Sequence, residues 1–157
     1  AANRLPPGRE GERMELLRPL FGKTGAEFTI TPDFHCDYGG NITLGEGFYA
    51  NYNLVILDCA PVTFGDNVLV GPGCGFYTAI HPLDAAHRAT GEEKAAPITV
   101  GSDVWFGGNV TVLPGVTIGD GAVIGAGSVV TRDIPPGVVA AGNPCRVLRP
   151  VDQEQAP

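Results

Sequence analysis

An apolar residue recurs every six positions through the C-terminal half of this chain. The residues of this series are Val100, Phe106, Val112, Ile118, Ile124 and Val130. A second series of mostly small residues stands four positions after each of them: Val104, Val110, Val116, Ala122, Ser128 and Ile134. A period of six suits neither a helix with 3.6 residues per turn nor a simple alternating strand. It predicts short strands joined by tight corners, with three six-residue units making one triangular coil.

The same period appears earlier in the chain, with one eight-residue step between Ile56 and Phe64 around Cys59. Each apolar residue is expected to point into the prism and to stack on its equivalent one coil away, about 4.8 Å along the axis. Glycine directly follows four of the six later apolar residues, and we expect it to supply the positive φ of the corner. About a hundred residues fit this register, which predicts five or six coils.

We expect three parts along the chain. Residues 1–27 form a helical capping segment, with a short helix over Glu10–Phe21 that Pro19 limits. Residues 28–142 form the β-helix, and residues 82–97, where the six-residue pattern stops, form a protruding loop. Residues 143–157 pack back on the helix. Because the chain begins with Ala1 and not Met, we expect some N-terminal residues of the natural protein to be missing.

Composition narrows the possible partners. The net charge of -7 argues against nucleic acid, which needs a clustered basic surface. The sequence has neither a long apolar run nor a signal-peptide pattern, so we expect a soluble cytoplasmic protein without a membrane partner. Four cysteines without a CxxC pair, and with no histidines at zinc-ligand spacing, predict reduced structural thiols and no metal.

His81 is the residue that most suggests chemistry. It stands where the six-residue pattern ends and the irregular loop begins, and histidine is the side chain best suited to remove a proton from a hydroxyl near neutral pH. A plain surface histidine is the alternative that position alone leaves open. His35 and His87 lack a comparable placement.

Several sequence stretches together are specific for a known family. The stretches are FHCDYGGNITLGEGFYANYNLVILD from Phe34, IHPLD from Ile80, VWFGGNVTVLPGVTIGDGAVIGAGSVVTRDIPPGVVAAGNPCRV from Val104. In this order they resemble the maltose and galactoside O-acetyltransferases, which are hexapeptide-repeat acyltransferases, over residues 34–149. The resemblance implies an all-β fold, a left-handed parallel β-helix, assembled as a homotrimer with active sites between subunits. It also implies acetyl-CoA as the donor, a sugar hydroxyl as the acceptor, and no required metal.

The resemblance also implies roles for individual residues. His81 matches the general base, Asn51 a residue that binds and polarises at the reacting centre, and Asp37 a polar contact to the acceptor. Asp58 is also assigned to the acceptor contacts. Its neighbour Cys59 occupies a position that is acidic in galactoside-type relatives, and Asp58 need not point the same way, which favours a maltose-like or other acceptor. The residues that match the coenzyme A channel and its phosphate contacts are Trp105, Gly107, Gly108, Ala126, Thr131, Arg132, Arg146 and Arg149. Family members begin with a longer helical segment that supplies an acidic residue to the acceptor pocket.

Two other functions are open at this stage. A related hexapeptide transferase could acetylate an antibiotic or an amino or serine-like acceptor. A non-catalytic solenoid could instead bind a partner or a metal, although its metal site would need several converging histidines and the chain has three.

Overall fold

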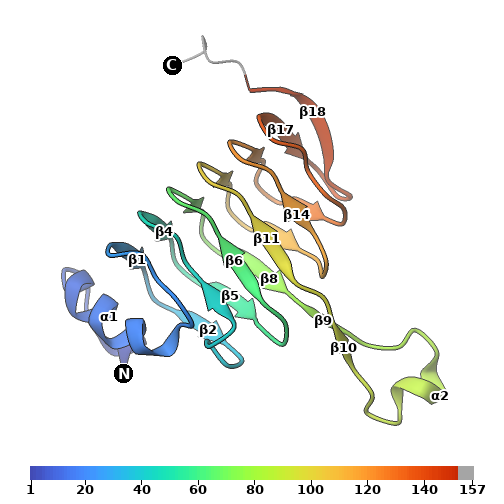
Figure 1. The fold of residues 1–157 in the computed structure, drawn as a ribbon, viewed down its shortest axis with the longest axis horizontal. Helices are drawn as coiled ribbons and strands as arrows, with labels where there is room; N and C mark the ends of the chain where they lie inside the picture. The colour runs from blue at the N-terminus through green and yellow to red at the C-terminus, as the bar shows by residue number, and fades with distance from the viewer. Residues whose placement is uncertain (152–157) are drawn as a thin grey trace.

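A computed structural model describes residues 1–151, and most of them wind into a three-sided coil of short parallel strands (Figure 1). Each side of the coil is a sheet with one strand per turn. The seven-stranded face consists of β1 (Phe28–Ile30), β4 (Phe48–Ala50), β7 (Leu69–Val70), β12 (Trp105–Phe106), β15 (Val123–Ile124), β17 (Val138–Ala141) and β18 (Arg146–Pro150). The five-stranded face consists of β2 (Phe34–Cys36), β5 (Leu54–Leu57), β8 (Gly75–Tyr77), β13 (Thr111–Val112) and β16 (Val129–Val130). The four-stranded face consists of β3 (Ile42–Thr43), β6 (Val62–Phe64), β11 (Ile98–Val100) and β14 (Thr117–Ile118).

The two predicted apolar series form the interior of the prism. Every member is buried, and the most exposed of them, Ile134, is only 4% exposed. Val100 pairs with Ile118 and Phe106 with Ile124, so equivalent residues stack 18 positions apart, which is three six-residue units. Four rings, Phe48, Phe64, Phe76 and Phe106, continue the core in tilted and edge-to-face contacts, with successive centroids 5.0, 4.9 and 5.2 Å apart. Such aromatic pairs contribute about 0.5–1.5 kcal/mol each beyond the burial of their area.

The glycines that follow the inward residues have a different role from the one predicted. Gly107 has a negative φ, and a Cβ placed on it would lie 2.6 Å from the backbone nitrogen of Ala126 in the next coil. Positive φ falls two residues later in each unit, for example at Gly121 (φ 65) and at Asn109 (φ 57). The prediction was therefore wrong on this point: close contact between coils, and not corner conformation, excludes a side chain at these positions.

Extra residues accumulate at one edge of the prism, between the five- and four-stranded faces, which we call the insertion edge. Phe34 pairs with Leu54, 20 positions away, whereas Val112 pairs with Val130, 18 positions away. The two additional residues of the early coils fall between the end of a strand in the five-stranded face and the next strand in the four-stranded face. The protruding loop leaves at the same edge one coil later, so all insertions stack on one side.

The protruding loop contains more structure than its irregular sequence predicts. β9 (Ala79–Ile80) and β10 (Lys94–Ala95) pair antiparallel at its base, and α2 (Ala85–Arg88) forms one helical turn near its end. Figure 1 shows this loop projecting away from the prism. None of residues 81–95 is buried, so the loop is held by polar contacts and not by a core.

Segments before and after the β-helix cover the two ends of the prism. At the N-terminal end lie a 3-10 turn (Ala2–Arg4), α1 (Glu10–Leu17) and a second 3-10 turn (Arg18–Leu20) that contains Pro19, so the predicted helix is present but its last turn is tighter. At the other end β18 turns back and pairs antiparallel with β17. Residues 152–157 of the predicted C-terminal segment lie outside the described residues. Within residues 1–151, every helix is too short or too polar to span a bilayer.

Candidate active site

Four polar side chains gather at the insertion edge, and we call Asp37, Cys59, His81 and Glu93 the edge cluster. The Cys59 thiol donates to Oδ2 of Asp37 over 3.4 Å. His81 Nε2 lies 3.4 Å from Oε2 of Glu93, and the two side chains are 61% and 38% exposed. The insertions explain this meeting, because Asp37, Cys59 and the loop leave three successive coils at the same edge. An exposed imidazole beside a carboxylate can accept a proton and is then stabilised as the cation.

The thiols are poorly suited to act as nucleophiles. The pKa of Cys59 is raised to about 11, mainly by burial. The hydrogen bond and charge of Asp37, and then those of Glu93, make smaller contributions in the same direction. Burial and the charges of Asp58 and Asp37 raise the pKa of Cys36 to about 11 as well. Burial also raises the pKa of Cys74 and of Cys145. Because the thiolate is the reactive form, these side chains remain neutral at physiological pH.

Asp58 has a structural position that the sequence did not predict. Its side chain is fully buried, and its Oδ1 accepts from the backbone N–H groups of Asp37 (3.1 Å) and Tyr38 (2.9 Å). Its Oδ2 accepts from the N–H of Asn41 (3.3 Å). The carboxylate therefore braces the inserted segment that carries Asp37. No side-chain surface is left on Asp58 for an acceptor in this chain, so we replace its predicted substrate contact with this bracing role.

Asn51 lies at a different edge from His81. It follows β4, at the edge between the seven- and five-stranded faces, which we call the glycine edge because Gly71, Gly107 and Gly125 occupy the equivalent positions after β7, β12 and β15. Asn51 is half-buried, and its Oδ1 accepts from the N–H of Tyr52 over 2.8 Å. A single chain therefore does not bring Asn51 and His81 together.

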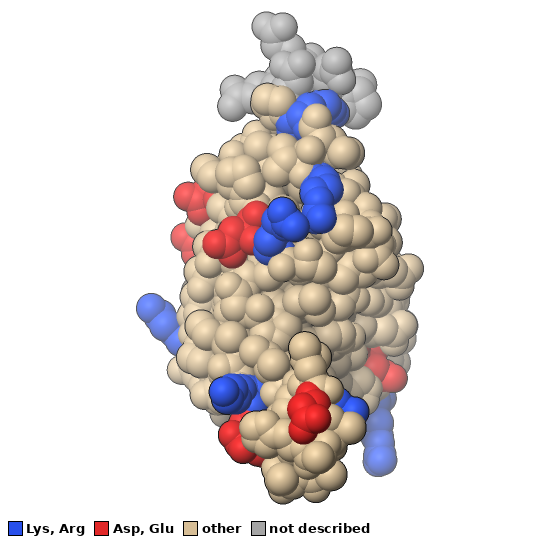
Figure 2. Space-filling view, turned by 90° about the vertical axis from the view of Figure 1, so that its right-hand side faces the viewer, with Lys and Arg blue, Asp and Glu red and all other residues tan. Residues whose placement is uncertain are grey.

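The residues predicted to line a coenzyme A channel divide between the two edges and the C-terminal strand. Gly107, Gly108 and Ala126 lie at the glycine edge, and Trp105 projects from the adjoining face with 55% of its surface exposed. Thr131 and Arg132 follow β16 at the insertion edge, whereas Arg146 and Arg149 lie on β18. All three arginines are exposed. They are the only basic residues after Lys94, and Figure 2 shows this basic group near the C-terminal end of the prism.

An outward row on the seven-stranded face links several of these positions. Tyr49 pairs with Leu69, Leu69 with Trp105, Trp105 with Val123, Val123 with Val139 and Val139 with Arg149. Tyr49 and Leu69 are 37% and 48% exposed, and neither was predicted from the sequence. The repeat held the signal, since each stands directly before an inward residue, as Trp105 does. Glu93 was also missed, because it lies in the irregular loop where no period identifies a face.

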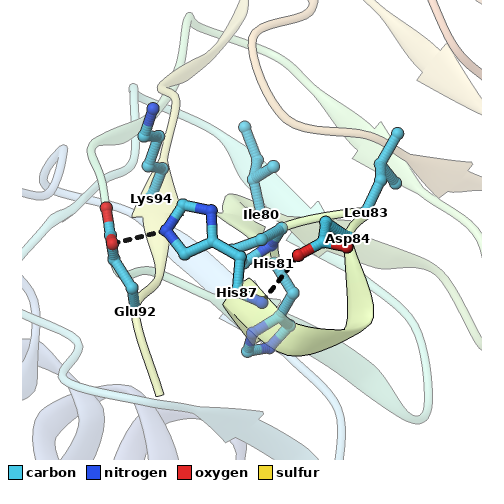
Figure 3. Close-up of a pocket in the computed structure, with 8 residues that line it drawn as sticks. Ile80, His81, Leu83, Asp84, His87, Glu92 and Lys94 are labelled. Carbon is cyan, nitrogen blue, oxygen red and sulfur yellow. Dashed lines mark hydrogen bonds and ion pairs between the residues drawn. The ribbon is translucent and has the colours of Figure 1, made fainter. Parts of the chain in front are cut away.

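A cavity of about 300 Å³ opens beside His81 within the loop. Ile80, Leu83, Asp84 and Lys94 contribute to its lining, and His87 Nε2 lies 2.6 Å from Oε2 of Glu92 across it (Figure 3). Neither Asn51 nor an arginine of the C-terminal end borders this cavity. Among residues 1–151, no group of three or more His, Cys, Asp or Glu side chains is arranged to hold a metal ion.

Known proteins with similar sequence and structure identify the family. A family model for bacterial transferase hexapeptide repeats (six repeats) matches residues 97–132. The chain is 47% identical over 150 residues to the galactoside O-acetyltransferase of Escherichia coli (strain K12), covering 96% of this chain and 74% of that protein. Its fold is similar to that of a maltose O-acetyltransferase from Clostridium difficile 630, with a TM-score of 0.94, 47% identity, and coverage of 97% of this chain and 81% of the other.

A galactoside acetyltransferase in complex with coenzyme A is also similar, with a TM-score of 0.93, 46% identity, and coverage of 96% of this chain and 76% of the other. These likenesses confirm the predicted all-β architecture, a left-handed parallel β-helix of hexapeptide repeats. The chain is an acetyltransferase, and it belongs to the maltose and galactoside O-acetyltransferase family of hexapeptide-repeat enzymes.

Proposed function

We propose that this protein transfers the acetyl group of acetyl-CoA to a hydroxyl of a sugar, with His81 as the general base. The observation that carries the proposal is the pairing of an exposed His81 with Glu93 at the insertion edge, beside Asp37 and Cys59. Family membership supplies the reaction class, since the relatives include a galactoside and a maltose O-acetyltransferase.

The proposed reaction needs no covalent enzyme intermediate. His81 takes the proton of the acceptor hydroxyl while that oxygen attacks the thioester carbonyl, and Glu93 stabilises the imidazolium that forms. The tetrahedral intermediate then collapses, the C–S bond breaks, and the proton passes from His81 to the sulfur of coenzyme A. The products are the acetyl ester and free coenzyme A. The raised pKa values of the four thiols support this direct route over a cysteine-bound acetyl group.

The division of the site between two edges supports assembly of several copies. The insertion and glycine edges both border the five-stranded face, whose outward row consists of His35, Val55, Gly75, Thr111 and Val129. This row contains no Lys, Arg, Asp or Glu, so little charge would lose its hydration in a contact between copies. If the copies are related by a rotation axis parallel to the prism, equivalent coils of all copies lie at the same height. The insertion edge of one copy then meets the glycine edge of the next.

We propose a homotrimer on this basis, with three sites, each formed by His81 of one copy and Asn51 of the next. Three copies are the number that the family resemblance implies. Asn51 would then contact the reacting groups from the side opposite the base. The exposed Asp37 and the half-buried Cys59, which share the insertion edge with His81, would hydrogen-bond the hydroxyl groups of the acceptor.

The glycine edge and the C-terminal arginines suit acetyl-CoA. Side chains at Gly107 and its equivalents would collide with the next coil, so the edge presents bare backbone along which a thin pantetheine arm can lie. Trp105 and Arg149 share one outward row, and Arg132, after β16, and Arg146, on β18, lie at the same end of the prism. Guanidinium groups bind phosphates through paired donors. The third edge carries Glu46, Asp66, Asp103 and Asp120 and would repel an anionic co-substrate.

We place the reaction in the cytoplasm, where acetyl-CoA is formed and used.

A panel of acceptors with a thiol-release assay for coenzyme A tests the function. We expect turnover with at least one mono- or disaccharide, and His81→Ala should lower kcat by about 10² to 10⁴, the usual contribution of a general base. The KM for acetyl-CoA should change little. Turnover with an antibiotic or amine and with none of the sugars would favour the alternative acceptor class. A His81→Ala variant with near-normal kcat would refute the role of the base.

A further inference from the structure

The backbone around His81 is fixed at two points by the residues beside it. Before His81, Ile80 pairs with Lys94 in the antiparallel β9–β10 ladder. After His81 comes Pro82, and a residue that precedes proline is largely restricted to extended conformations. These contacts leave open how the chain beyond Pro82 is held, since none of residues 81–95 is buried.

Arg88 provides the missing contact. Its Nη1 donates to the carbonyl oxygen of Pro82 over 2.9 Å and to that of Leu83 over 3.1 Å, and these are the two carbonyls that follow the base. A guanidinium group is always charged and presents its N–H groups in a fixed plane, so it can hold two neighbouring carbonyls at once.

The turn that carries Arg88 is itself anchored to the same segment. The Asp84 side chain accepts from the N–H of His87 over 2.8 Å and caps α2, and the N–H of Arg88 donates to the Asp84 carbonyl over 2.9 Å. The contact of His87 Nε2 with Oε2 of Glu92, 2.6 Å apart, then ties the turn to the segment that leads into β10 (Figure 3). Residues 82–88 therefore close into a ring that begins directly after the base and ends at Arg88.

We infer that Arg88 is a positioning residue for acetyl transfer. It fixes the backbone after His81, so that the imidazole stays where the acceptor hydroxyl and the thioester meet. This inference rests on the proposed function, because it concerns the same base. Arg88 contacts the loop backbone and is not needed to bind either substrate. Its loss should therefore lower kcat and leave the KM for acetyl-CoA nearly unchanged.

Arg88→Ala and Arg88→Lys test this inference, with Arg9→Ala as the matched control, because Arg9 is an exposed arginine paired with Glu12 on α1. We expect Arg88→Ala to lower kcat by about 10- to 100-fold, the usual effect of a small misplacement of a reacting group. The KM for acetyl-CoA should stay within about twofold. Arg88→Lys should recover part of the loss, since an ammonium group can still donate to one carbonyl, and Arg9→Ala should match the unchanged protein.

A second readout does not depend on turnover. In the NMR spectrum of the ligand-free protein, Arg88→Ala should shift and broaden the imidazole signals of His81 and leave those of His35, on β2, unchanged. An unchanged kcat in Arg88→Ala would overturn the inference, and so would a lower kcat with unchanged His81 signals. If the unchanged protein acetylates none of the acceptors, the proposed function fails, while the spectra still decide whether Arg88 positions His81.

Discussion

The buried Asp58 carboxylate offers a sharp test of how the insertion edge is built. Asp58→Ala removes the acceptor of three backbone N–H groups, those of Asp37, Tyr38 and Asn41. Each buried donor left without a partner costs about 1–3 kcal/mol, and water entering the new space will satisfy part of the need. We therefore expect the free energy of unfolding to fall by about 3–5 kcal/mol. For a chain of this size, that corresponds to a loss of roughly 10 °C in Tm.

Asp58→Asn should have a smaller effect because it keeps the shape and one acceptor oxygen. Its amide NH2 group would face a backbone donor, so we expect a loss of about 2–3 kcal/mol. Asp120→Ala is the control, since the Asp120 carboxylate accepts from one backbone N–H, that of Ser102 over 2.8 Å, and Asp120 is exposed. We expect this control to lose about 1 kcal/mol or less.

Thermal and urea unfolding at one fixed protein concentration, followed by circular dichroism, measure these differences. Acceptor KM is measured in parallel at a temperature where all variants are folded. An Asp58→Ala protein with unchanged Tm and a raised acceptor KM would refute the bracing role and return Asp58 to the substrate contacts.

Three further predictions concern the site. Glu93→Gln should lower kcat by about 10-fold or more, because the imidazolium loses its carboxylate partner, and an unchanged kcat would remove Glu93 from the mechanism. Peptide mass spectrometry can follow the alkylation rate of Cys59 as the pH is raised. This rate should rise about tenfold per pH unit towards pH 11, because the raised pKa keeps the thiol protonated below that value. A plateau near pH 9 would contradict the raised pKa. Arg149→Ala should raise the KM for acetyl-CoA several-fold at low salt and less at high salt, because salt screens an exposed contact with a phosphate. An increase in KM that does not depend on salt would argue against that contact.

The interior of the prism follows directly from the repeat. Val100, Ile118 and Ile124 lie where the period places them, because the same two positions of each six-residue unit face the axis. The role of the glycines was wrong because one coil's sequence does not show how closely the next coil passes. That distance depends on stacking between coils 18 residues apart and is visible at Gly107 and Ala126 only in three dimensions.

The edge cluster was predictable only in part. The break in the period identified His81, and the family resemblance identified Asp37, but their shared edge depends on insertions in three successive coils. Glu93 and Arg88 lie in a loop without periodicity, so no pattern indicates which side chains turn back towards the base. Asp58 was assigned to the acceptor from its position beside Cys59, and that position does not show that backbone donors of the inserted segment surround its carboxylate.

Mixed assemblies of two inactive variants test most directly whether His81 of one copy works with Asn51 of another. His81→Ala and Asn51→Ala chains, co-expressed with different tags and purified as mixed oligomers, should regain activity, because some sites combine an intact His81 with an intact Asn51. Every mixed cyclic trimer contains two copies of one variant and one of the other, so one of its three sites is restored. Recovery to about one third of the kcat of the unmodified protein, and none when His81→Ala is mixed with the double variant, is the expected result. Activity that stays at the level of the separate variants would contradict the shared site.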